Sequence, residues 1–88
     1  MSQAELHDAL KQLIVERLFL DRKGIAAGDL ATDADLMEAY DIDSVELFEI
    51  VVALDEEYGV QVPEEEFSIE LYRSVAKLAA LVEQYGSA

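Results

Sequence analysis

The sequence predicts an all-α fold: a four-helix bundle of three main helices plus one short helix, with a long loop between the first and second helices. Apolar residues recur at spacings of three and four in several segments, which is the period of a helix with one buried face. The one short alternation typical of a strand is 59–62. A chain of 88 residues has room for one small core, so we expect a single domain over residues 1–88.

The first helix is expected from about Gln3 to Leu20. A long connection follows from Asp21 to Asp43. Such a connection in a small domain is usually functional or anchored to the core. The buried face of the helix is expected to contain Leu6, Leu10, Leu13, Ile14 and Leu18, and the anchors of the connection are expected to be Leu30, Leu36, Met37 and Tyr40.

The second helix should run from Ser44 to about Tyr58, where Gly59 can take the left-handed conformation that ends helices. Pro63 favours a short helical turn through Glu64–Phe67. Ser74 is the expected cap of the last helix. That helix would bury Val75, Leu78, Ala79, Val82 and Tyr85, and Gly86 would end it.

On a helical wheel the second helix has two apolar sides. The core stripe consists of Leu47, Ile50, Val51, Leu54 and Tyr58. Val45, Phe48 and Val52 fall away from this stripe, beside Glu49 and Glu56. Phe48 and Val52 could pack under the long loop or the third helix. Alternatively, the outer side is an exposed docking strip whose carboxylates attract basic partners.

Asp43 and Ser44 open this helix and allow two interpretations. Asp43 with Glu46 three residues later fits a capping box, which makes Ser44 an ordinary first-turn residue. The Ser44 hydroxyl could instead carry a phosphodiester at the positive end of the helix. No His or Lys is close in sequence to activate this serine. If it is modified, another enzyme must do so.

Charge is strongly segregated along the chain. The net charge is −14, yet no Lys or Arg occurs between Gly24 and Tyr72, which contains most of the acidic residues. Such a field repels nucleic acid and anionic lipid and attracts basic protein surfaces, although solubility alone could also explain it. We expect no nucleic-acid partner, no membrane insertion, a monomer, and a cytoplasmic location. The six basic residues are Lys11, Arg17, Arg22, Lys23, Arg73 and Lys77.

Other chemistry is poorly supported by the composition. The absence of cysteine excludes disulfides and thiolate sites, and the one histidine, His7, lies near the N-terminus. Two aspartate pairs, at 33–35 and 41–43, suggest calcium, but neither has the spacing of a calcium-binding loop. We therefore expect neither a metal site nor an enzyme.

The run from Asp43 to Val60, followed by Pro63, resembles the acyl carrier protein family. The resemblance covers nearly the whole chain, including Leu36 eight residues before the serine and Ser74-Val75 at the last helix. It implies a four-helix bundle whose serine carries 4′-phosphopantetheine. The arm would be added from coenzyme A by a phosphopantetheinyl transferase. Acyl or aminoacyl groups would be loaded by a ligase and delivered to downstream synthases.

By this resemblance Ser44 is the attachment site, and Asp43 supports the modification, through the magnesium of the transferase. The implied apolar docking contacts are Val45, Phe48 and Val52, and the implied carboxylates that partners recognise are Glu46, Glu49 and Glu56. The reactive thiol then belongs to the cofactor, which accounts for the missing catalytic groups.

Some positions depart from the family pattern. Tyr40-Asp41 replaces the usual leucine and glycine, and Val45 replaces leucine or methionine. Together with Leu71–Val75, these differences favour a carrier of a specialised lipid, polyketide or peptide pathway over the carrier of general fatty-acid synthesis. The alternative function is an unmodified acidic helical adaptor or inhibitor that docks on basic surfaces.

Overall fold

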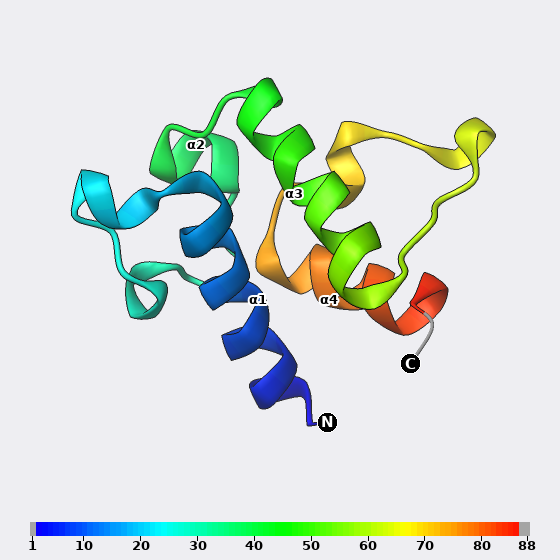
Figure 1. Ribbon diagram of the computed structural model, residues 1–88, viewed down its shortest axis with the longest axis horizontal. Helices are drawn as coiled ribbons and strands as arrows, with labels where there is room; N and C mark the ends of the chain where they lie inside the picture. The colour runs from blue at the N-terminus through cyan, green and yellow to red at the C-terminus, as the bar shows by residue number, and fades with distance from the viewer. Residues whose placement is uncertain (1, 87–88) are drawn as a thin grey trace.

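The computed structural model describes residues 2–86, which form eight helical segments around one hydrophobic core. α1 (Gln3–Leu18) packs against both α3 (Ser44–Tyr58) and α4 (Val75–Tyr85). α2 (Leu36–Tyr40) lies in the connection between α1 and α3. Residues 2–86 contain no strand. In Figure 1 the first turn of α3 lies at the top of the view, whereas α1 begins at the bottom and α4 ends at the lower right. The predicted all-α bundle is confirmed.

Four short 3-10 segments join the α-helices. They are η1 (Leu20–Lys23), η2 (Ala27–Asp29), η3 (Glu64–Glu66) and η4 (Ile69–Tyr72). The predicted turn after Pro63 corresponds to η3. The segment η4 was not predicted; it packs against both α3 and α4 and buries Tyr72 in the core.

Two predictions about the first half of the chain need correction. α1 ends at Leu18 and not at Leu20, because Phe19 takes a left-handed conformation with φ 54°. The connection is not simply a loop, since it contains η1, η2 and α2. Its predicted anchors do hold it: Leu30 and Leu36 are buried, and Met37 and Tyr40 pack partly buried against the core. The Tyr40 hydroxyl also accepts a hydrogen bond from the Ala31 amide at 2.6 Å.

The core consists of the helix faces that the periodicity predicts. Leu6, Leu10, Ile14 and Leu18 of α1 are buried, and so are Leu47, Ile50 and Leu54 of α3 and Val75, Leu78 and Ala79 of α4. Gly59 ends α3 in the predicted left-handed conformation, with φ 67°. The Ser74 hydroxyl caps α4 by accepting a hydrogen bond from the Lys77 amide at 3.1 Å.

An ion pair fastens α2 to the segment before α4. Asp35 caps α2: its Oδ1 accepts the amides of Met37 at 2.9 Å and Glu38 at 3.3 Å. Its Oδ2 lies 2.6 Å from an amino nitrogen of Arg73. The Leu36 amide donates to the Arg73 carbonyl at 2.7 Å. Burial alone would raise the pKa of the Asp35 carboxyl, but Arg73 and the two amides together lower it below its ordinary value.

We expect Asp35→Asn to destabilise the chain at neutral pH and to matter less in acid. Asparagine caps helices as well as aspartate does, so the substitution removes mainly the charge that pairs with Arg73. A lowered native pKa adds stability above the unfolded-state pKa, which is about 3.9, and this stability is lost as the pH falls through the native value. Urea unfolding of the native chain and of Asp35→Asn, from pH 7 to pH 3, would measure the difference between their free energies of unfolding.

The control is Asp33→Asn, which removes the same charge from an exposed position of the same connection. An equal response of the two variants at every pH would contradict a specific role for the Asp35–Arg73 pair.

Candidate functional site

The start of α3 places Ser44 at the surface. Asp43 is the N-cap, and its Oδ1 accepts the Glu46 amide at 2.7 Å. In return, Glu46 Oε1 accepts the Asp43 amide at 3.2 Å, so the predicted capping box is confirmed. Ser44 is the first residue of the helix and is exposed. Its hydroxyl is therefore accessible to a partner enzyme and lies where the backbone amides have no intrahelical partner.

The residues before the cap fix the direction in which the chain enters α3. Asp41 is left-handed, with φ 56° and ψ 42°. Ile42 is buried in the core. The left-handed region strongly favours glycine, and Asp is among the few other residues that tolerate it. Asp41 thus stands at the position where the family pattern has glycine, in a conformation that favours glycine. It adds an exposed carboxylate three residues before Ser44.

We expect Asp41→Gly to stabilise the chain by about 0.5–1 kcal/mol, because glycine takes the left-handed conformation without a Cβ penalty. Thermal or urea unfolding would measure this. The matched control is Asp33→Gly, where φ is not positive, so glycine there adds only flexibility to the unfolded chain while removing the same charge. A loss of stability in Asp41→Gly would contradict a Cβ penalty at this position.

The outer side of α3 exposes the predicted apolar strip. Val45 is 75% exposed, Phe48 53% and Val52 39%. At these exposures neither Phe48 nor Val52 is buried beneath the long connection or the third helix. The strip begins one residue after Ser44 and descends along the helix.

A groove extends this strip toward the segment after α3. It has a volume of about 550 Å³ and is lined by both α3 and the following residues, among them Phe48, Val52, Val62, Phe67 and Tyr72. Phe67 is 40% exposed, and its ring centroid lies 5.6 Å from that of Tyr72. The position of Phe67 at the surface was not predicted from the sequence. An aromatic residue directly after three glutamates was the available signal.

The three predicted partner-binding carboxylates differ in their surroundings. Glu46 belongs to the capping box, and its Oε2 lies 3.7 Å from Lys23 Nζ. Glu56 lies 2.8 Å from an amino nitrogen of Arg17. Glu49 is exposed, and no ion pair joins it to another residue in 2–86. Arg17 of α1 and Lys23 of η1 therefore partly neutralise the acidic segment between Gly24 and Tyr72, which contains no Lys or Arg.

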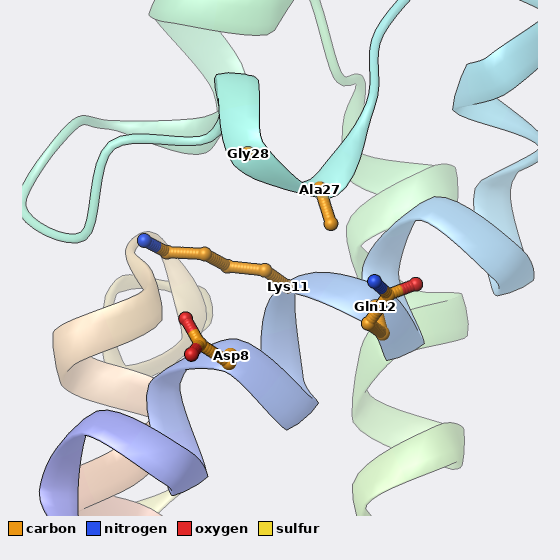
Figure 2. Close-up of a pocket in the computed structure, with 5 residues that line it drawn as sticks. All are labelled: Asp8, Lys11, Gln12, Ala27 and Gly28. Carbon is orange, nitrogen blue, oxygen red and sulfur yellow. The ribbon is translucent and has the colours of Figure 1, made fainter.

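Neither a metal-binding cluster nor a membrane-spanning helix is found among residues 2–86. Within the part of the chain that is described, no three His, Cys, Asp or Glu side chains gather so as to hold a metal ion. No helix among these residues is long and apolar enough to cross a membrane. Figure 2 shows a pocket of about 240 Å³ between α1 and η2. It is lined by Asp8, Lys11, Gln12, Ala27 and Gly28, none of which is a predicted site residue.

A family described as "Phosphopantetheine attachment site" matches residues 8–82. The acyl carrier protein of Akkermansia muciniphila is 30% identical over 84 residues, 96% of each chain. The polyketide-8 synthase acyl carrier protein 2 of Streptomyces avermitilis is 38% identical over 61 residues, 69% of this chain and 64% of that one.

A similar fold is found in the solution structure of a holo acyl carrier protein from Nitrosomonas europaea. The TM-score is 0.68 and the identity 22%, over 89% of this chain and 92% of that chain. At this identity the likeness concerns the fold alone.

Proposed function

The chain belongs to the acyl carrier protein family, whose members carry 4′-phosphopantetheine and are not catalysts, and we propose that Ser44 is the residue that carries this group here. The observation that supports Ser44 most strongly is its position: an exposed hydroxyl on the first residue of α3, directly after the Asp43 cap. When bound, the arm supplies a terminal thiol that holds the cargo as a thioester. The chain itself supplies position and recognition.

The surroundings of Ser44 suit a phosphodiester. The hydroxyl is exposed, and α3 is a helix of 15 residues whose N-terminal end carries partial positive charge. Lys23 brings an ammonium group to the same end, through its contact with Glu46. These features favour a negatively charged group on Ser44.

Asp43 has two proposed roles. Its Oδ1 fixes the first turn of α3 through the Glu46 amide, which holds Ser44 in a defined position for the transferase. Its negative charge on the exposed surface would assist the transferase through the magnesium of that enzyme. Asp43→Asn separates these roles, since asparagine preserves the cap but removes the charge.

The proposed docking surface for the transferase, the loading ligase and the synthases is the outer side of α3. Val45, Phe48 and Val52 would supply apolar contact, while Glu46, Glu49 and Glu56 would attract basic side chains. The exposure of the strip and the net charge of −14 support this role. Among residues 2–86, Glu49 is the one of these three carboxylates without an internal ion pair, since Glu46 pairs with Lys23 and Glu56 with Arg17.

The proposed pathway is a specialised lipid, polyketide or peptide pathway. The 38% identity with the Streptomyces avermitilis polyketide carrier supports this proposal, as it exceeds the 30% identity with the Akkermansia muciniphila protein, although over fewer residues. Asp41 in place of glycine would add a specificity feature beside the arm. Loading assays of the modified chain with fatty-acyl, malonyl and aminoacyl ligases would identify the cargo class.

Mass spectrometry tests the attachment site. The chain is incubated with coenzyme A, magnesium and a broad-specificity phosphopantetheinyl transferase, and the intact mass is measured. We expect a gain of one phosphopantetheine unit, which peptide mapping then locates at Ser44. A gain located on another serine, or no gain with both the broad-specificity enzyme and the transferase of the source organism, would overturn the proposal.

A further inference from the structure

η1 is a short turn that brings one basic side chain to α3. It is bounded by two left-handed residues, Phe19 with φ 54° and Gly24 with φ 79°. Leu20, the first residue of the turn, is fully buried. Phe19 is exposed although it is large and apolar, and its backbone lies in a region that few such residues adopt. Two left-handed residues thus bound the turn, and Leu20 anchors it in the core.

The two bases of η1 have different surroundings. The guanidinium carbon of Arg22 lies 4.9 Å from the centre of the Phe19 ring, so Arg22 interacts within its own segment. Lys23 Nζ instead lies 3.7 Å from Glu46 Oε2, across the gap to α3. The other oxygen of the same carboxylate accepts the Asp43 amide. One carboxylate group therefore separates Lys23 from the residue that precedes Ser44.

The contact between Lys23 and Glu46 is a loose one. Its 3.7 Å separation exceeds the roughly 2.7–2.9 Å of a charge-assisted hydrogen bond. The Lys23 side chain is 47% exposed, and its flexible stem lets the ammonium reorient. Glu46 would keep its position without Lys23, because the Asp43 amide also holds it. A second anionic group that comes within reach of the ammonium at this end of α3 could therefore draw Lys23 away.

We propose that Lys23 is the chain's own counter-ion for a phosphodiester on Ser44, and that modification moves its ammonium group from Glu46 to that phosphodiester. This inference rests on Ser44 being the attachment site. Lys23 is then a positioning residue that limits the orientations of the arm where it leaves the protein. The move also leaves Glu46 accessible, so that the modified chain presents to basic partners one more carboxylate than the unmodified chain does.

Nuclear magnetic resonance of the modified chain tests this role. We expect the phosphorus resonance of the attached group to shift in Lys23→Gln and to return toward its native position in Lys23→Arg. The matched control is Arg22→Gln, which removes the same charge one residue away. A phosphorus resonance that is identical in the native chain and Lys23→Gln, or that Arg22→Gln moves equally, would overturn the proposal.

The side-chain carboxyl carbon of Glu46 provides a second measurement. Upon modification its resonance should move toward the position that it has in unmodified Lys23→Gln, where the lysine partner is missing. A resonance that stays at its unmodified position would overturn the transfer of Lys23. Mass spectrometry distinguishes the two proposals: attachment elsewhere overturns both, whereas attachment at Ser44 with unmoved resonances overturns only this one.

Discussion

Ser44→Ala is expected to abolish attachment of the phosphopantetheine arm completely while leaving the fold intact. The substitution removes the hydroxyl that would form the phosphodiester, and no neighbouring serine can replace it at the first position of α3. Alanine is the best helix former, and the cap of α3 comes from Asp43 and not from Ser44. The loss should therefore be purely chemical. Intact mass after incubation with transferase measures the attachment of the arm, and circular dichroism measures whether the fold is retained.

The matched control is Ser68→Ala. Ser68 is also exposed and also lies at the start of a helical segment, where its hydroxyl accepts the Glu70 amide at 3.3 Å. We expect this variant to gain the full mass. Modification of Ser44→Ala would show that the arm is attached to another residue.

Leu54→Ala and Phe48→Ala should affect different properties, although both residues are apolar and lie on α3. We expect Leu54→Ala to lower stability and Phe48→Ala to weaken partner binding. Leu54 is fully buried, and truncation of such a leucine costs about 2–5 kcal/mol, because it loses burial and leaves a cavity. A domain of this size has only about 5–15 kcal/mol of stability in total. Phe48 is 53% exposed, so we expect its truncation to cost less than about 1 kcal/mol.

Urea unfolding of the two variants measures the first difference, and titration with the transferase measures the second. We expect Phe48→Ala to bind the transferase more weakly, since the exposed ring lies on the proposed docking surface. Leu54→Ala should bind normally under conditions where it remains folded. Equal losses of stability in the two variants would show that Phe48 belongs to the core.

Local signals in the sequence were sufficient for most of the site. The capping box of Asp43 and Glu46 depends on two residues three positions apart, and such contacts form within a single turn. The exposed strip follows from the period of the helix alone, which is why Val45, Phe48 and Val52 were predicted to lie outside the core stripe. Family resemblance then added the cofactor, which no residue of the chain reveals by itself.

Among the helical segments that escaped prediction, α2 and η4 are stabilised by distant partners. α2 has only five residues, too few to persist alone. It is held by the Asp35 cap and by Arg73, 38 positions further along the chain, through the ion pair and the Leu36 hydrogen bond. η4 likewise depends on packing against α3 and α4. The aspartate before an apolar residue, with Glu38 three positions later, was the one local signal for α2.

The sequence by itself determined the all-α class, the limits of α3, the position of Ser44 after its cap and the composition of the exposed strip, because each depends on the chemistry of residues close together in the chain. The tertiary structure decided which charges are compensated. Arg17 pairs with Glu56 and Lys23 with Glu46, although the sequence separates the bases from the acidic segment. The physical reason is that electrostatic energy depends on distance in space, and only the packing of α1 and η1 beside α3 sets that distance.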